Sequence, residues 1–125
     1  MSEFFTPESD PHLFKCPCNR PECDAPKPTE ALLDALDRIR DYVDRPVIVT
    51  SGVRCEERNT SVGGEADSEH LTGRAADIYT PTSAEMYAIV EACYVIRVAR
   101  IGVYRDKHVH IDVSASKPQH VMWVE

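Results

Sequence analysis

The sequence predicts a small α+β domain in which helices pack on an antiparallel sheet. Two segments have the apolar spacing of amphipathic helices, and several short segments are rich in β-branched residues, as strands are. A chain of 125 residues is long enough to bury one hydrophobic core. We therefore expect a single domain, with an irregular arm rich in cysteine and proline over residues 1–28 and the main body of the domain over residues 29–125.

The arm is expected to be irregular because of its composition. Residues 1–28 hold most of the nine prolines and three of the five cysteines. Proline fixes φ and removes a backbone donor, so long helices and strands are disfavoured there.

The helices of the body follow from apolar spacing. Residues 29–44 predict a helix, which Pro46 prevents from continuing. A second helix is expected to begin at Thr82, because Thr82 and Glu85 have the spacing of a capping box. The apolar faces of the two helices are expected to contain Leu32, Leu36, Ile39 and Val43 in the first, and Met86, Ile89, Val90 and Cys93 in the second.

Short β-branched segments predict the strands. The candidate strands are residues 47–51, 74–79, 100–104, 108–113 and 121–124. The stretch from Gly52 to Ser68 is polar and contains glycine, so we expect a loop there. Residues 105–107 are expected to form the turn between two neighbouring strands.

Composition excludes several classes of protein. The chain has 14 Lys and Arg against 21 Asp and Glu, a net charge of −7, which disfavours a nucleic-acid binder that neutralises phosphates. No apolar run reaches the length of about 20 residues that spans a bilayer, so we expect no membrane insertion. The first residues lack a basic segment followed by an apolar one, which predicts cytoplasmic synthesis without a signal peptide. We expect a monomer.

Two segments carry metal-binding chemistry. His70 and Asp77 lie seven residues apart, with Gly73 between them to permit a tight turn. Strand alternation places His108, His110 and Asp112 on one face of the segment 108–113 and apolar residues on the other. Two histidines and a carboxylate, with a position left for water, form a recurrent catalytic zinc site. A single histidine is more often a surface or packing residue, and we interpret His12 and His120 in that way.

The stretch SGVRCEERNTSVGGEADSEHLTGRAADI resembles the signature of the zinc D-Ala-D-Ala carboxypeptidase and L-alanyl-D-glutamate endopeptidase family, peptidase M15. The motifs that carry the resemblance are S-G-x-R at 51–54, N-x-x-V-G-G at 59–64, S-x-H-x-x-G-x-A-x-D at 68–77 and H-x-D at 110–112. The resemblance implies the hedgehog/DD-peptidase fold and one zinc ion held by His70, Asp77 and His110. It also implies that Arg54 stabilises the substrate carbonyl or oxyanion and that Ser68 hydrogen-bonds the substrate. The alternative for Ser68 is a turn residue.

The general base is the point where the sequence departs from that family. Many relatives have an acidic residue three positions before the last ligand, where this chain has Lys107. Asp106 in the turn, His108 on the face of the ligand, and Asp112 are the candidates, and Asp112 could instead orient His110. We expect Asp106 to be the base, with His108 assisting.

The resemblance implies a zinc metallopeptidase that hydrolyses an amide bond in the peptidoglycan stem peptide. A small catalytic domain of this kind is similar to phage endolysins, so we expect a lysis enzyme that acts on the cell wall, in the host periplasm, after release. The acidic pI fits less well, because an anionic wall favours a basic surface. The alternatives are a hedgehog-like zinc-binding recognition module without turnover, or a virion structural protein.

The cysteines allow three interpretations. Cys16, Cys18 and Cys23, together with Cys55, could bind a metal as thiolates, although C-x-C-x4-C is a poor match to the usual paired motifs. A disulfide could form after release, or the thiols could stay reduced and partly buried, which we expect for a cytoplasmic product. Cys93 is expected in the core.

Overall fold

A five-stranded sheet of order β1-β2-β4-β3-β5 forms the centre of the computed structural model, which describes residues 2–125. Its strands are Val49–Ser51 (β1), Ala75–Tyr79 (β2), Arg100–Tyr104 (β3), His108–Asp112 (β4) and Val121–Val124 (β5). Strands β1, β2, β4 and β3 are antiparallel to their neighbours, as the sequence predicts. The fold is of the predicted α+β class.

Strand β5 is parallel to β3, which the sequence did not predict. The chain turns back after β4, so β5 runs opposite to β4 and lies beyond β3 at the edge of the sheet. Because β3 is also antiparallel to β4, β5 and β3 must run in the same direction.

The helices are Pro11–Phe14 (α1), Glu30–Val43 (α2), Glu56–Ser61 (α3) and Ser83–Val95 (α4), with a 3-10 turn at Glu69–Thr72 (η1). Helix α2 begins where the Thr29 hydroxyl accepts a hydrogen bond from the Leu32 N–H. The Thr82 hydroxyl accepts from the Glu85 N–H and starts α4 as predicted. Helix α3 lies in the stretch that the sequence assigned to a loop.

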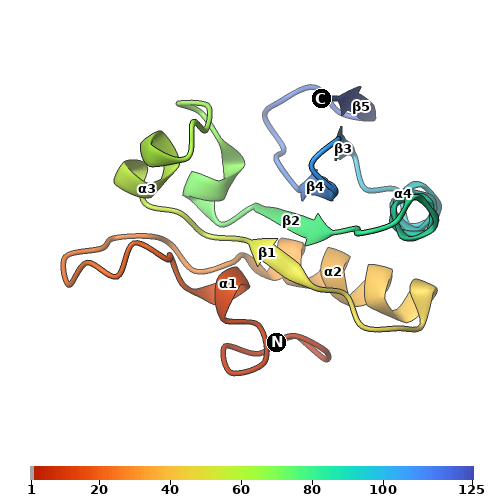
Figure 1. Ribbon diagram of the computed structural model, residues 1–125, viewed down its shortest axis with the longest axis horizontal. Helices are drawn as coiled ribbons and strands as arrows, with labels where there is room; N and C mark the ends of the chain where they lie inside the picture. The colour runs from red at the N-terminus through yellow and green to blue at the C-terminus, as the bar shows by residue number, and fades with distance from the viewer. Residues whose placement is uncertain (1) are drawn as a thin grey trace.

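The core lies between α2, α4 and one face of the sheet (Figure 1). Figure 1 shows α2 on the side of the sheet opposite to α3. The predicted helix faces are confirmed, because their residues belong to the core or pack against it. The sheet contributes its alternate residues to this core: Val49, Ala76, Ile78, Ile101, Val109 and Ile111.

The arm packs on the body through apolar side chains and hydrogen bonds. Phe5 and Leu13 are buried in the core. Asp37 of α2 accepts hydrogen bonds from the Ser2 hydroxyl and from the Phe4 N–H, at 2.6 and 3.1 Å. Asp37 therefore fastens the beginning of the arm to α2.

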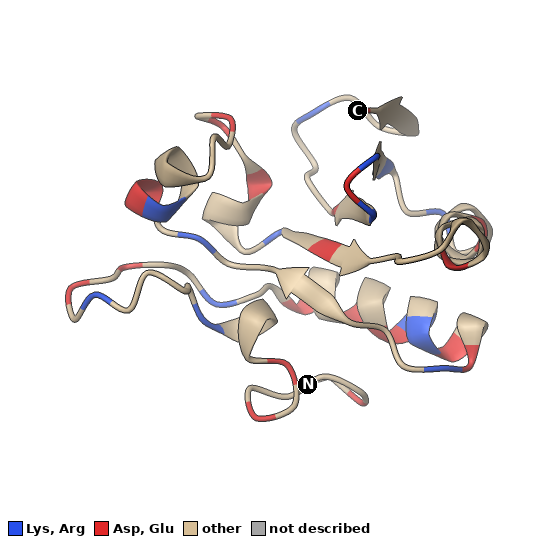
Figure 2. Ribbon diagram, in the orientation of Figure 1, with Lys and Arg blue, Asp and Glu red and all other residues tan. Residues whose placement is uncertain are grey.

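Charged residues of both signs are distributed over the helices and loops (Figure 2). The acidic excess is therefore spread over several elements, including α2 and α3. Within residues 2–125, no helix is both long enough and apolar enough to cross a membrane.

Candidate metal centre

The face of the sheet that points away from the core is polar at its middle. Strand alternation directs Ala76 and Ile78 of β2 into the core and leaves Asp77 on the other face. Asp77 is the direct cross-strand partner of His110 on β4. The antiparallel pairing of β2 and β4 therefore brings together two residues that are 33 positions apart in the chain.

His70 reaches the same point from η1. The Ser68 hydroxyl accepts a hydrogen bond from the His70 N–H at 3.2 Å and starts the turn. Gly73 ends the turn with a φ of 75°, and a Cβ there would lie 2.2 Å from the Lys27 carbonyl oxygen. Glycine is thus required between the two predicted ligands, both for its backbone conformation and for the close approach of the arm.

The ring of His70 is oriented for metal binding. Its Nδ1 lies 2.6 Å from the Gly52 carbonyl oxygen, which can only accept, so Nδ1 carries the proton. Nε2 then carries the free lone pair, and this atom lies 3.3 Å from Asp77 Oδ1. A backbone carbonyl that fixes the tautomer is the usual partner of a metal-binding histidine.

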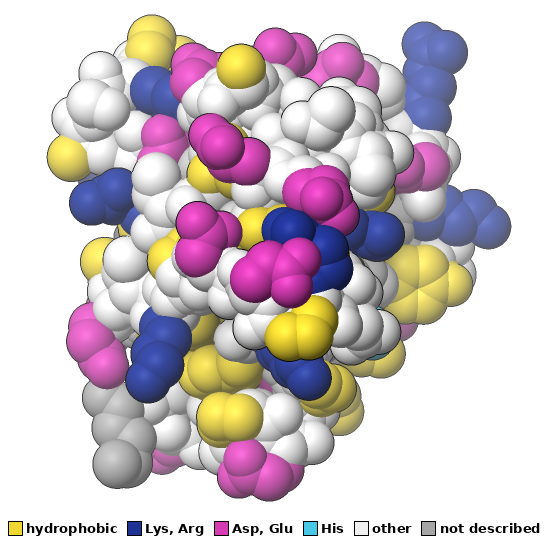
Figure 3. Space-filling view, turned by 90° about the vertical axis from the view of Figure 1, so that its left-hand side faces the viewer, with side chains coloured by type: hydrophobic (Ala, Val, Ile, Leu, Met, Phe, Trp, Pro, Cys, Tyr) yellow, Lys and Arg dark blue, Asp and Glu magenta, His cyan; other side chains and the backbone are white. Residues whose placement is uncertain are grey.

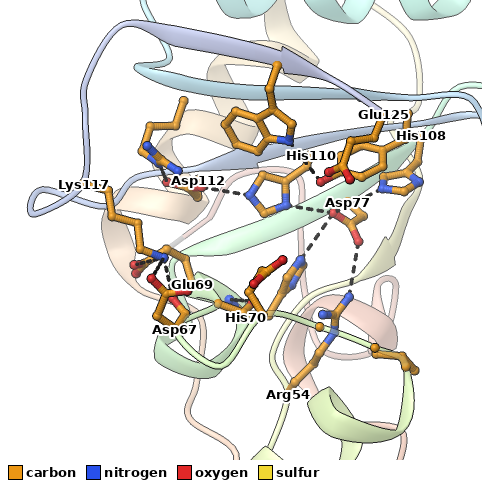
Figure 4. A pocket seen from close by; sticks show the side chains of 18 of the residues that line it. Arg54, Asp67, Glu69, His70, Asp77, His108, His110, Asp112, Lys117 and Glu125 are labelled. Atoms are coloured by element: carbon orange, nitrogen blue, oxygen red, sulfur yellow. Dashed lines mark hydrogen bonds and ion pairs between the residues drawn. The ribbon is translucent and has the colours of Figure 1, made fainter.

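Three donor atoms converge at the predicted site (Figure 4). His110 Nδ1 lies 3.1 Å from Asp77 Oδ1, and the ligand atoms of His70, Asp77 and His110 are all within 4.8 Å of one another. Two imidazoles and one carboxylate suit zinc, although such a set also accepts other divalent ions. The donor set therefore fits the ion that the sequence resemblance implies.

Asp112 holds the far side of the His110 ring. His110 Nε2 donates to Asp112 Oδ2 at 2.8 Å, and Arg100 Nε lies 2.8 Å from Asp112 Oδ1. Burial alone lowers the pKa of His110, but its bonds to Asp112 and Asp77 outweigh burial and raise that pKa. Burial alone raises the pKa of Asp112, but the contacts with His110 and Arg100 outweigh burial and lower that pKa.

Arg54 lies beside the ligand carboxylate. Its Nη2 is 3.5 Å from Asp77 Oδ2, and its Nη1 donates to Asn59 Oδ1 at 3.1 Å. Ser51 accepts from Nε at 3.3 Å and from Nη2 at 3.1 Å. Burial lowers the pKa of Arg54, against the opposing effect of Asp77.

The charge on Asp77 is strongly stabilised by its neighbours. Burial raises the pKa of Asp77, but hydrogen bonds and charge interactions with His110 and His70 outweigh it and hold the pKa far below its usual range. Asp77 is 7% exposed, so it is an ionised carboxylate inside the protein. A buried anion with imidazoles around one oxygen is a suitable place for a cation.

His108 also faces the ligands, and Asp106 lies behind it. His108 Nε2 is 3.9 Å from Asp77 Oδ1, whereas Nδ1 forms a short contact with Asp106 Oδ1. The Tyr104 ring stacks on the His108 ring with centroids 4.2 Å apart. Lys107 is exposed and has a φ of 73°, the left-handed conformation expected at the end of a three-residue hairpin loop.

The donor atoms lie in a cleft of about 770 Å³. All the residues that the sequence proposed for the site line it: Arg54, Ser68, His70, Asp77, Asp106, His108, His110 and Asp112. Its walls also contain Glu69 and Lys117, whose side chains form an ion pair at 3.1 Å. The cleft is mostly polar in its side chains, as a peptide-binding site can be.

Several residues of the site were not found from the sequence. Arg100 was one of them, although the predicted turn at 105–107 pairs Arg100 with Asp112 and could have identified it. Asn59 and Ser51 were quoted only as parts of motifs, and their contacts with Arg54 depend on the fold of α3 and β1.

Trp123 of β5 covers the sheet at its outer edge. Its ring centroid is 5.5 Å from that of His110, and its indole N–H donates to the Tyr104 hydroxyl at 3.1 Å. A Cβ on Gly102 would lie 2.6 Å from the Trp123 ring, so only glycine leaves room for the indole. The parallel pairing of β5 determines this contact, and the sequence did not predict it.

The chain was compared with known proteins. The family model described as Peptidase M15 matches residues 9–112, which is most of the chain and includes every ligand of the candidate site. A search of curated proteins found no match. The family match agrees with the resemblance carried by the sequence motifs. The chain therefore belongs to the peptidase M15 family of hydrolytic metallopeptidases.

Proposed function

We propose that this protein is a zinc-dependent peptidase that hydrolyses an amide bond in the peptidoglycan stem peptide, and that it acts as a phage lysis enzyme on the host cell wall. The observation that carries the proposal is the convergence of His70 Nε2, Asp77 Oδ1 and His110 Nδ1 in an open cleft beside Arg54. Membership of a peptidase family supports the reaction. The motif resemblance supports the substrate class and the lysis role.

The proposed metal ligands are held by the protein around them. Gly52 fixes His70, Asp112 fixes His110, and the arginine beside Asp77 leaves Oδ1 to face the two imidazoles. When bound there, zinc acts as a Lewis acid that polarises the scissile carbonyl and makes a water more acidic. His110 must lose its Nδ1 proton before it can act as a ligand, so protons compete with the metal at this residue.

His108 is the proposed proton carrier. Its Nε2 faces the ligand cluster, whereas Asp106 contacts Nδ1 on the opposite side of the ring. We expected Asp106 to be the base with His108 assisting; the geometry favours the reverse, in which Asp106 orients His108. His108 would then accept a proton from the attacking water and deliver it to the leaving amine.

Arg54 and Ser68 are the proposed substrate-binding residues. The guanidinium of Arg54 stays charged and is held in place by Ser51 and Asn59, so it can stabilise negative charge that develops on the substrate carbonyl oxygen. Ser68 uses its oxygen to accept from the His70 N–H, which leaves its O–H free to donate to a peptide carbonyl.

The test is mass spectrometry of fragments released from purified peptidoglycan by the zinc-loaded protein, with and without a chelator. We expect soluble peptides whose release stops with the chelator, and their new termini identify the bond. Release that continues without metal would contradict a metallopeptidase. No release by protein shown to hold zinc in the cleft would favour the recognition module or the virion protein.

The role of His108 needs a separate measurement. His108→Ala should retain the metal of the cleft and lower kcat, and Asp106→Asn should lower kcat less, because it removes only the partner of the ring. A kcat that falls more in Asp106→Asn than in His108→Ala would return the role of base to Asp106.

A further inference from the structure

Four of the five cysteines meet at one place outside the cleft. The Sγ atoms of Cys16, Cys18, Cys23 and Cys55 all lie within 4.8 Å of one another. The first three come from the arm, and Cys55 directly precedes α3. Cys93 is separate and packs in the core. The five cysteines therefore form a cluster of four and one separate core residue.

The spacing of the sulfurs suits a shared ion. The Cys16 and Cys55 sulfurs are 3.6 Å apart. In a tetrahedral site with zinc–sulfur bonds of about 2.3 Å, sulfurs are about 3.8 Å from one another. Four thiolates are a complete ligand set for a structural zinc ion, with no position left for water.

Hydrogen-bond donors surround the cluster as they would surround thiolates. Cys55 Sγ accepts from the Arg58 N–H at 3.4 Å and from Arg20 Nη2 at 3.5 Å. Cys16 Sγ accepts from the Cys55 N–H at 3.4 Å, and Cys18 Sγ from the Arg20 N–H at 3.5 Å. Neutral thiols buried as small apolar side chains need no such donors.

An ion bound by the cluster would stabilise the position of the arm. The part of the arm that carries Cys16, Cys18 and Cys23 has no helix or strand after α1, so little backbone hydrogen bonding holds it. On the outside, Arg20 pairs with Glu57 of α3 at 3.0 Å. Figure 3 shows the face with the arm and α3, where acidic and basic side chains are mixed and the hydrophobic areas are small and separate. Exposed ion pairs of this kind contribute little stability.

We propose that Cys16, Cys18, Cys23 and Cys55 bind a second, structural zinc ion that fastens the arm to α3. Cys55 is adjacent to Arg54, and α3 carries Asn59, which binds the Arg54 guanidinium. The ion therefore also supports the loop that places Arg54 beside Asp77. The proposal can be tested separately from the proposed peptidase activity, because the two groups of ligands have no residue in common.

The test is the zinc content of the purified protein, measured by mass spectrometry after gel filtration, for four proteins. We expect two zinc ions per chain in the wild type and in the control Cys93→Ala. Loss of one ion is expected in Cys18→Ser/Cys23→Ser, from the cluster, and in His110→Ala, from the cleft. Replacement by Co²⁺ should give thiolate-to-cobalt charge-transfer absorption in His110→Ala and none in the double cysteine variant.

If the double cysteine variant fails to fold, the proposal can still be tested in His110→Ala, in which the cysteine cluster is intact. In His110→Ala, a mercurial reagent should release the remaining zinc as the cluster thiols react. The proposal is overturned by cluster thiols that react without releasing metal, or by zinc that is fully retained in the double cysteine variant. A measured protein mass that is lower by two hydrogens for each pair of cysteines would also overturn the proposal, since such a mass would establish disulfides. None of these results depends on peptide hydrolysis.

Discussion

Asp112 offers a sensitive test of how the ligands are held. Its carboxylate accepts from His110 Nε2 at 2.8 Å and is 2% exposed, so Asp112→Asn keeps the shape of the contact and removes the charge. A hydrogen bond to a charged group contributes about 1.5–3 kcal/mol and a neutral one about 1 kcal/mol. The difference is about 0.5–2 kcal/mol, so we expect the zinc affinity of the cleft to fall by about 2-fold to 30-fold.

The matched control is Asp106→Asn. Asp106 makes the same kind of contact with His108, which is not a ligand in this account, and its side chain is largely exposed. Zinc affinity should therefore be unchanged in Asp106→Asn. Asp112→Asn also leaves Arg100 without its carboxylate partner, so thermal unfolding of both variants must confirm that they are folded at the temperature of the assay.

The assay is a competition titration with a chromophoric chelator, and His110→Ala identifies which bound ion belongs to the cleft. Equal affinity in Asp112→Asn and wild type would refute the orienting role of Asp112. An equal loss of zinc affinity in both Asn variants would contradict the assignment of His110 as the ligand in preference to His108.

Three further predictions concern the fold and its titration. Leu36 is fully buried, so Leu36→Ala should lower the free energy of unfolding in urea by about 2–5 kcal/mol, whereas exposed Asp34→Ala should change it by less than about 0.5 kcal/mol. A smaller loss in Leu36→Ala than in Asp34→Ala would contradict the placement of α2. Gly102→Ala should displace the single tryptophan from the sheet, at a cost of about 1–3 kcal/mol, and an unchanged fluorescence spectrum would contradict the contact. In metal-free protein the raised pKa of His110 means that its contribution to stability is fully present below about pH 6.5 and is lost as the pH rises through its folded-state value. Urea unfolding with a chelator should show this fall in the wild type and a smaller one in Asp112→Asn; equal pH dependence would count against the coupling.

Much of the sheet and the main helices could be predicted from the sequence, because local patterns determine them. The spacing of Leu32, Leu36 and Ile39 is enough to place a helix and its buried face. The alternation in β4 placed His110 on the polar face before its partners were known. The ligand set came from motif resemblance, and the structure brings those three residues together.

Features that depend on distant parts of the chain were not predicted. Helix α3, Glu56–Ser61, has no apolar period, and a cysteine begins it, so its sequence is typical of a loop. The approach of Cys23 to Cys55 follows from the path of the arm over the body, which no local pattern encodes. The orientation of His108 relative to Asp106 depends on the hairpin conformation at Lys107, which the spacing of the residues alone does not determine.

The most direct test of the central claim is zinc readdition to metal-stripped protein, followed by measurement of new peptide termini in purified peptidoglycan. The wild type should regain hydrolysis as the cleft is filled, and His110→Ala should remain inactive even when zinc is bound at the cysteine cluster. Hydrolysis by His110→Ala at the wild-type rate would contradict the assignment of His70, Asp77 and His110 as the catalytic metal site.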